Sequence, residues 1–194
     1  MRRVCVFSGS SAGRRDEYRA AACDLGRELA ARDIEIVYGG AKVGLMGAVA
    51  DAALAAGGRV IGVIPEALVV KEVAHAGLRD LRIVTSMHER KAVMADLSDG
   101  FIALPGGWGT LDELFEVLTW GQLALHAKPS GMLNAAGYFD PLLAFMDHMI
   151  DEGFVRPEHR PMLTVATSAG EMLTRMADYR APAAEKWVEG RVER

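Results

Sequence analysis

A glycine-rich turn followed at once by two carboxylates is the part of this sequence best suited to chemistry. Residues 105–113 read PGGWGTLDE, so three glycines surround a tryptophan just ahead of Asp112 and Glu113. A glycine turn that opens a helix presents bare amides and the positive end of the helix dipole, and both attract an anion. The two acids would repel the same anion. The stretch therefore predicts a ligand with two parts: a phosphate at Gly106–Thr110, and a neighbouring group that becomes positive during a reaction.

Glu113 also has a purely structural interpretation. Thr110 and Glu113 in TLDE match the capping box, in which a hydroxyl and an acid three residues later satisfy free amides at a helix start. Ser86 and Glu89 in SMHE match the same pattern, and for Glu89 capping and a ligand contact are equally open. At Glu113 the adjacent glycine turn favours a carboxylate that faces the ligand and that the helix dipole keeps ionised.

Two basic residues are expected close to this turn. Arg90 and Lys91 fall in the first turn of the helix predicted from residue 87. They would offset the repulsion between Glu113 and a phosphate and would clamp the ligand. The alternative is that both are solvated surface charges, which is the usual state of an exposed Arg–Lys pair.

Short apolar runs rich in β-branched residues alternate with segments of helical spacing. The runs predict strands at 3–8, 34–39, 59–64, 81–85, 100–105, 130–134 and 162–166. The intervening segments predict helices at 16–32, 46–57, 87–98, 111–125, 138–152 and 169–179. This alternation is typical of a parallel sheet covered by helices on both faces. We therefore expect one Rossmann-like, doubly wound α/β domain over residues 1–180, followed by a charged C-terminal tail at 181–194.

Three glycine-bearing loops follow predicted strands. They are SGSSAG at 8–13, GGAKVGLMG at 39–47 and PGGWGT at 105–110. In doubly wound sheets, ligands bind outside the carboxyl ends of the strands, so these loops should converge on one site. Their convergence favours a phosphate-bearing ligand over ordinary turn chemistry.

Composition and missing motifs exclude several other classes of ligand. Neither the dinucleotide G-x-G-x-x-G nor the Walker G-x-x-x-x-G-K-[ST] spacing occurs, so we expect no nicotinamide, flavin or other cofactor. The five histidines and two cysteines lack metal-ligand spacing, so we expect no metal. A net charge of -4 without a basic stripe argues against nucleic acid, and no apolar stretch is long enough to span a membrane. A reducing cytoplasm is the expected location.

The longer sequence around these motifs resembles a known family. SMHERKAVM, LPGGWGTLDELFEVLTWGQL and VYGGAKVGLMGAVADAAL are similar to the LONELY GUY proteins, cytokinin-activating phosphoribohydrolases once loosely labelled lysine decarboxylases. Their P-G-G-x-G-T-x-x-E signature is complete from Pro105 to Glu113, and the likeness spans most of the chain. Ala41, Ser86 and Asp112 depart from the common family residues without breaking the signature.

The resemblance implies a specific reaction and a specific set of site residues. The reaction is hydrolysis of the N-glycosidic bond of a nucleoside 5′-monophosphate, such as AMP or isopentenyladenosine monophosphate, to free base and ribose 5-phosphate. The catalytic pair would be Arg90 and Glu113, and the protein would be a homodimer with active sites near the subunit contact. The expected substrate-binding residues are Glu72, Lys91, Gly106, Gly107, Trp108, Gly109, Thr110, Leu111, Asp112 and Thr119.

Two rival functions stay open on the sequence alone. Lysine decarboxylation would need a pyridoxal phosphate aldimine, for which Lys91 is the only lysine well placed. A non-catalytic nucleotide or cofactor carrier on a similar fold would use the same glycine loops. Because phosphate capture alone gains nothing from a carboxylate at position 113, the sequence favours the enzyme. The preferred base, adenine or an isoprenoid-substituted adenine, is not fixed by any residue pattern.

Overall fold

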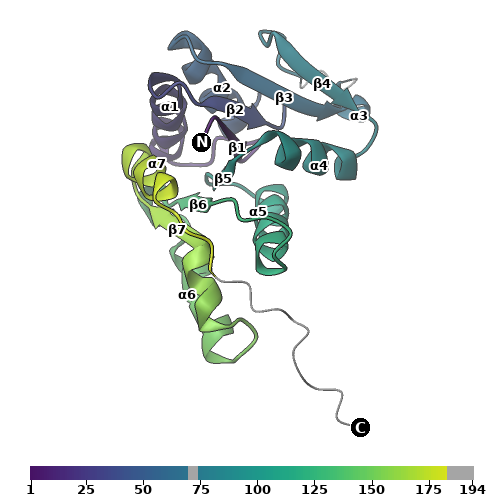
Figure 1. Cartoon of the computed structure of the whole chain (residues 1–194). Coiled ribbons are helices and arrows are strands. Elements are labelled where there is room, and N and C mark those ends of the chain that lie inside the picture. Colours follow the sequence, from purple (N-terminus) through teal and green to yellow (C-terminus); the bar gives the residue numbers. More distant parts are fainter. Residues whose placement is uncertain (70–73, 183–194) are drawn as a thin grey trace.

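The computed structural model describes residues 1–69 and 74–182 (Figure 1). All seven predicted strands are present and pair in parallel. They are β1 (Arg3–Phe7), β2 (Glu35–Tyr38), β3 (Val60–Pro65), β4 (Asp80–Val84), β5 (Gly100–Ala103), β6 (Ser130–Leu133) and β7 (Leu163–Ala166). Each observed strand overlaps its predicted run to within two residues at either end, because β-branched runs of this length suit a sheet buried on both faces.

The strand order is β4-β3-β2-β1-β5-β6-β7, so the direction of winding reverses between β1 and β5. In the pairing of these two strands, Phe7 lies opposite Ala103 at their carboxyl ends. This reversal opens a crevice beyond the strand ends, which is where open α/β sheets bind ligands. The predicted doubly wound α/β architecture is therefore confirmed, and the loops after β1 and β5 meet at the reversal.

Six of the seven α-helices lie in the segments predicted to be helical. They are α1 (Asp16–Ala31), α2 (Gly44–Ala55), α4 (Met87–Leu97), α5 (Trp108–Gln122), α6 (Asp140–Asp151) and α7 (Ala169–Ala177). The four-residue α3 (Glu66–Val69) and the short 3-10 helices η1 (Ala135–Gly137) and η2 (Pro157–Met162) were not predicted. Helix α5 begins three residues before the predicted start at 111, a difference that matters for the site.

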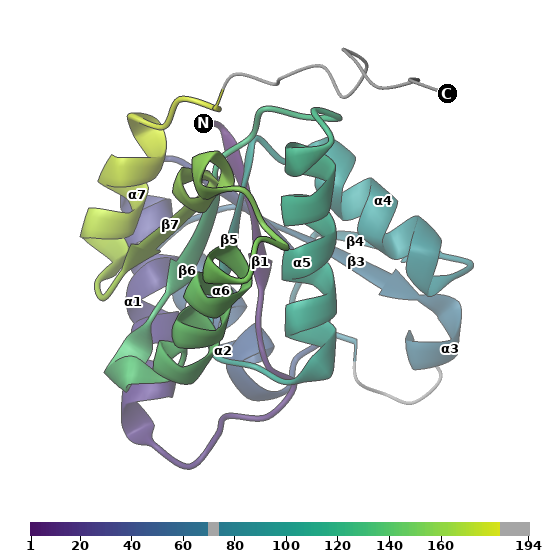
Figure 2. The same ribbon diagram turned by 90° about the horizontal axis from the view of Figure 1, so that it is seen from below.

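The helices cover the two faces of the sheet as separate layers. Figures 1 and 2 show α1, α2 and α7 on one side and α4, α5 and α6 on the other. Side chains of β1 alternate between the two cores: Val4 and Val6 pack under α1 and α2, whereas Cys5 and Phe7 pack under α4 and α5. This period of two is what a central strand buried on both faces requires. The sheet is thus packed on both faces, and its strand ends border the crevice.

Two predictions fall partly or wholly outside the described residues. Glu72 lies in the segment 70–73, and the tail predicted at 181–194 is described only for Ala181 and Pro182. Within the described part of the chain, no helix has the length and apolar character needed to cross a membrane.

Candidate active site

Backbone hydrogen bonds tie the three glycine-bearing loops together at the carboxyl ends of the strands. The amide of Gly9 donates to the carbonyl of Pro105 at 3.0 Å. The carbonyl of Gly9 in turn accepts from the amides of Leu45 and Met46, at 3.0 and 3.4 Å, at the start of α2. The loops after β1, β2 and β5 therefore converge as predicted, and Gly9 links all three.

Gly106 holds the turn in place because it has no side chain. A Cβ there would lie 2.1 Å from Thr110 Oγ1 and 2.8 Å from the amide nitrogen of Gly9. Gly107 and Gly109 differ, because a Cβ at either would meet nothing within 4 Å. The first glycine of the turn is thus needed for packing, whereas the other two leave open space over the start of α5.

A cavity of about 280 Å³ lies between the loop after β1 and the glycine turn. Its walls come from four parts of the chain that are distant in sequence. They are Gly9, Ser10, Ser11, Ala12, Gly13 and Tyr18, then Leu45, then Pro105, Gly106 and Gly107, and finally Tyr138. The cavity therefore sits at the reversal of the sheet, where a phosphate-bearing ligand is expected.

The first turn of α5 borders this cavity with free amides. The helix begins at Trp108 with Gly107 as its N-cap, and its first bond runs from the amide of Leu111 to the carbonyl of Gly107. The amides of Trp108, Gly109 and Thr110 are consequently the ones that a helix start leaves without an internal partner. Together with the helix dipole, they form an anion-binding end.

The structural alternative for Glu113, a capping box that begins at Thr110, does not form. Thr110 lies inside the first turn rather than at the N-cap, and it is only 3% exposed, packed against Gly106. The glycines let the helix begin at Trp108, three residues before the start predicted from TLDE. Glu113 therefore does not cap the helix. At α4 the pattern holds: Ser86 is the N-cap and its hydroxyl accepts from the amide of Glu89 at 3.1 Å.

Glu113 faces Arg90 from the neighbouring helix. Arg90 Nη2 lies 3.6 Å from Glu113 Oε1, and each side chain is 10% exposed. Arg90 Nε donates to the carbonyl of Val63 at 3.2 Å, at the carboxyl end of β3. The pair is therefore buried at the strand ends, with the guanidinium bonded to the sheet, and the alternative that Arg90 is a solvated surface charge is excluded.

Gly39, the residue after β2, makes room for Arg90. A Cβ on Gly39 would lie 1.9 Å from Arg90 Nη2 and 3.0 Å from its Cζ. The guanidinium therefore occupies the volume that any other residue at position 39 would fill. Sequence reasoning placed Gly39 only where a predicted strand meets a glycine-bearing loop, because nothing in its neighbourhood along the chain reveals an arginine approaching from 51 residues away.

The carboxyl of Glu113 is less acidic than the sequence led us to expect. Burial raises its pKa from the ordinary 4.5 to about 7, although the positive charges of Arg90 and Lys91 act in the opposite direction. The acids Asp112 and Glu116 add to the rise. Loss of water therefore outweighs the attraction of nearby positive charge, and the carboxyl is less fully ionised at neutral pH than its place at a helix start suggests.

Lys91 is paired with acids of α5. Its Nζ lies 3.1 Å from both Asp112 Oδ2 and Glu116 Oε1. Burial lowers the pKa of Lys91, but the hydrogen bonds that Lys91 donates to these two carboxylates, together with their charges, outweigh burial and leave the pKa raised. Lys91 and Asp112, both predicted to bind substrate, are therefore joined to each other, and they fasten α4 to α5 beside the Arg90–Glu113 pair.

The remaining predicted residues of α5 point in different directions. Trp108 is 91% exposed at the mouth of the glycine turn, whereas Leu111 packs against the core under α4 and α5. Thr119 lies six residues beyond Glu113, which is about 9 Å along the helix axis. Its hydroxyl donates to the carbonyl of Phe115 at 2.7 Å. Thr119 therefore lies apart from Arg90, Glu113 and the glycine turn of the same chain.

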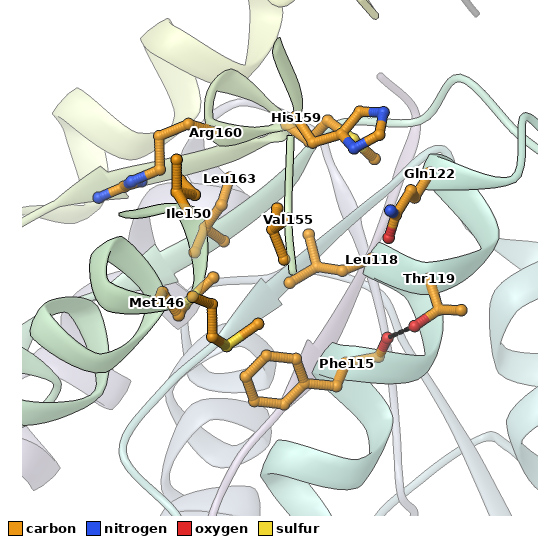
Figure 3. Close-up of a pocket in the computed structure, with 12 residues that line it drawn as sticks. Phe115, Leu118, Thr119, Gln122, Met146, Ile150, Val155, His159, Arg160 and Leu163 are labelled. Atoms are coloured by element: carbon orange, nitrogen blue, oxygen red, sulfur yellow. Dashed lines mark hydrogen bonds between the residues drawn. The ribbon is translucent and has the colours of Figure 1, made fainter. Parts of the chain in front are cut away.

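Thr119 instead lines an apolar groove between α5, α6 and η2 (Figure 3). The groove has a volume of about 130 Å³, and Phe115, Leu118, Met146 and Val155 contribute much of its surface. The α5 residues that line it are spaced at i, i+3, i+4 and i+7, so they form one face of the helix. That face is turned away from α4, whereas Glu113 is turned towards it.

Two polar residues at the site carried no signal that our sequence reasoning used. Ser8, next to Gly9, has a buried hydroxyl with no hydrogen-bond partner among the described residues. Tyr138, 32 residues after the glycine turn, donates a hydrogen bond from its hydroxyl to the carbonyl of Gly106 at 2.5 Å.

Over the same described residues, no three His, Cys, Asp or Glu side chains form a group able to hold a metal ion.

Comparison with known sequences gives a consistent result. The family described as possible lysine decarboxylase matches residues 46–176. A probable cytokinin riboside 5′-monophosphate phosphoribohydrolase of Oryza sativa subsp. japonica is 53% identical over 92% of this chain and 78% of its own length. A cytokinin riboside 5′-monophosphate phosphoribohydrolase of Arabidopsis thaliana is 49% identical over 92% of this chain and 84% of its own length.

Solved structures of lower identity share the fold. A molybdenum cofactor binding protein from Rippkaea orientalis aligns with a TM-score of 0.70 at 20% identity, covering 91% of this chain and 95% of that one. The molybdenum cofactor carrier protein of Chlamydomonas reinhardtii aligns with a TM-score of 0.68 at 20% identity and the same coverage. On its sequence matches, its signature from Pro105 to Glu113 and its fold, the chain belongs to the LONELY GUY family, whose broader grouping is described as possible lysine decarboxylase.

Proposed function

We propose that this protein hydrolyses the N-glycosidic bond of a nucleoside 5′-monophosphate, releasing the base and ribose 5-phosphate. The observation that carries the proposal is the enclosed Arg90–Glu113 pair beside the free amides of the glycine turn. A site built only to capture phosphate would gain nothing from a carboxylate in that place. The names of the rice and Arabidopsis relatives, at about half identity over most of both chains, support the same reaction.

The glycine turn would hold the 5′-phosphate. The amides of Trp108, Gly109 and Thr110 point from the helix start, and Gly107 leaves space beside them. Phosphate binding at a distance from the broken bond supplies energy that fixes the sugar in the reactive position. A nucleoside that lacks the phosphate should therefore be a poor substrate.

Glu113 would act at the sugar. Breaking the bond between C1′ and the base nitrogen develops positive charge on the ribose ring. An ionised Glu113 stabilises that charge or orients the attacking water, and a pKa of about 7 leaves a substantial ionised fraction at neutral pH. Arg90 carries only hydrogen-bond donors, so it orients Glu113 and contributes positive charge.

Release of free base from purified protein tests this proposal. We expect adenine from AMP and isopentenyladenine from isopentenyladenosine monophosphate, with little base from adenosine. The ratio of kcat/KM for the two nucleotides identifies the preferred base. Binding of AMP without any base release from either nucleotide would contradict hydrolysis and favour a carrier.

We further propose that the protein is a homodimer that uses the apolar groove between α5 and α6 as part of its contact. Phe145 and Phe154 are 57% and 84% exposed near this groove, and Leu125 is 70% exposed beyond the end of α5. Exposed apolar side chains gathered on one face mark an interaction surface. Thr119, which lies on that face and away from its own chain's Glu113, would then serve the site of the second subunit.

Sedimentation of the wild type and of Phe145→Asp tests the dimer. We expect a wild-type mass near twice 20.9 kDa and a lower mass for the variant. A monomeric wild type that still releases base would exclude a role for the groove in assembly.

We also propose a cytoplasmic location. The two described cysteines, Cys5 and Cys23, are both free, which fits a reducing compartment.

Lysine decarboxylation is the less favoured candidate. The aldimine that such chemistry uses needs a lysine that can lose its proton readily. Lys91, the lysine best placed by sequence, is held between Asp112 and Glu116 with a raised pKa. We expect no visible absorbance of pyridoxal phosphate after mixing, and no carbon dioxide release from lysine.

A further inference from the structure

Tyr138 contacts the glycine turn from a part of the chain that the signature does not include. Its hydroxyl donates to the carbonyl of Gly106 at 2.5 Å, and its ring lines the cavity between the turn and the loop after β1. Pro105, the residue before, has its carbonyl occupied by the amide of Gly9. Both carbonyls that precede the free amides of α5 are therefore engaged by donors on the protein.

The orientation of these carbonyls matters for an anion. A carbonyl oxygen carries partial negative charge, so one that turned into the cavity would repel a phosphate and cancel part of the attraction of the amides. Gly106 has the backbone freedom to make such a turn, since glycine populates more conformations than any other residue. A hydrogen bond to its oxygen removes that freedom.

The segment that carries Tyr138 is itself firmly held. Asn134 accepts from the amide of Phe139 at 2.8 Å and donates to Asp140 at 2.7 Å. Ala136 and Gly137 adopt positive φ angles of 50° and 71°, a backbone shape that is costly for alanine. A strained turn stabilised by neighbouring hydrogen bonds is a pattern found where a side chain must be placed accurately.

An aromatic contact fixes the ring from the other side. Tyr18 of α1 packs edge-on against Tyr138 with ring centroids 5.4 Å apart, and Phe139 packs against it at 4.9 Å. Because Tyr18 also lines the cavity, the two tyrosines form one wall of it. Tyr179, which follows α7 and is not among the residues that line this cavity, provides the control for loss of a tyrosine hydroxyl.

We propose that Tyr138 is a positioning residue for phosphate recognition: its hydroxyl holds the Gly106 carbonyl out of the cavity, so that the amides at the start of α5 face the 5′-phosphate. This inference rests on the proposed function for the identity of the ligand. It does not require Tyr138 to touch the reacting atoms. Its loss should weaken binding of the sugar phosphate much more than it slows bond breaking.

Calorimetric binding of ribose 5-phosphate to wild type, Tyr138→Phe and Tyr179→Phe tests the proposal. We expect Tyr138→Phe to bind about five- to tenfold more weakly, the loss that one hydrogen bond implies, and Tyr179→Phe to bind within about twofold of wild type. For AMP turnover, KM should rise by the same factor in Tyr138→Phe, with kcat changed less than about threefold.

Other outcomes separate positioning from a merely structural role. Unchanged ribose 5-phosphate affinity in Tyr138→Phe would overturn the proposal, even if its thermal midpoint fell. A fall in kcat with unchanged KM would overturn it as well. If the wild type binds ribose 5-phosphate but releases no base, the proposed hydrolysis is refuted, and the binding comparison still decides the role of Tyr138. If the wild type binds no sugar phosphate, both proposals are refuted.

Discussion

The same four-residue pattern occurs at the starts of two neighbouring helices and leads to two different structures. At α4, Ser86 caps the helix and Glu89 accepts hydrogen bonds from the amide and hydroxyl of Thr85, at 2.7 and 2.6 Å. At α5, Thr110 is buried inside the first turn and Glu113 faces Arg90. One acid is used for local stability, and the other is enclosed opposite a cation.

The difference comes from the residues just before each pattern. Before Ser86 the chain is extended, and the serine hydroxyl is the first group able to satisfy the helix amides. Before Thr110 the glycines let the backbone enter the helix at Trp108, so the cap position falls on Gly107, which has no side chain. The amides of that turn therefore stay free for a ligand. A capping pattern thus needs its flanking residues before it can be interpreted.

Replacing both glutamates by glutamine should give the largest contrast. Glu113→Gln removes the negative charge expected to face the ribose cation, so turnover of AMP should fall by about 100-fold or more. Glu89→Gln, the matched control, should keep turnover within about threefold of wild type. Initial rates of adenine release measure both, and near-normal turnover in Glu113→Gln would remove this carboxylate from the chemistry.

Adding one methyl group at two adjacent glycines tests what starts α5. Gly106→Ala places a Cβ 2.1 Å from Thr110 Oγ1 and should cost about 2–3 kcal/mol of unfolding free energy. Gly107→Ala meets nothing within 4 Å, so its stability should stay close to wild type while its affinity for ribose 5-phosphate falls. Urea unfolding and calorimetry measure the two effects. Equal stability of both variants would show that the turn does not need the close contact at Gly106.

The stability of the protein should depend on pH through Glu113. Its pKa is raised in the folded state, from 4.5 to about 7, so the folded protein holds a proton that the unfolded chain has lost between these values. The contribution of Glu113 is full below pH 4.5 and is lost as the pH rises through 7. Unfolding free energies of Glu113→Gln minus wild type should therefore rise by about 1–3 kcal/mol between pH 5 and 8. A difference that is flat across this range would place the pKa near its ordinary value.

Removing the hydroxyl of Ser86 or of Thr110, the first residues of the two S/T-x-x-E patterns, should give the smallest changes in stability. Ser86→Ala loses a helix cap, which should lower the unfolding free energy by about 1 kcal/mol. Thr110→Val keeps the shape of a side chain that caps nothing in the described structure, and it should change stability less. Urea midpoints of the two variants measure the difference. A larger loss in Thr110→Val than in Ser86→Ala would mean that the buried hydroxyl makes a contact stronger than a cap.

The sequence was sufficient for most of the fold, and the two residues predicted to be catalytic, Arg90 and Glu113, do face each other, while their catalytic role stays a prediction. The β-branched runs predicted all seven strands, and the glycine loops after β1, β2 and β5 were expected to meet as they do. The start of α5 was predicted three residues too late because the helix begins within the glycine turn itself. The raised pKa of Glu113 was missed because it comes from burial, which depends on distant parts of the chain. Gly39 and Tyr138 were missed for the same reason, since their partners lie 51 and 32 residues away.

The missing side chain at Gly39 has a consequence for how related sequences can diverge. Since the guanidinium of Arg90 fills the space where a methyl group would stand, a side chain at position 39 would push that guanidinium aside. A lineage that acquired alanine at 39 would keep the sheet and the phosphate-binding turn but would shift Arg90 relative to Glu113. On the role proposed for this pair, such descendants would still bind nucleotides and would cleave them more slowly.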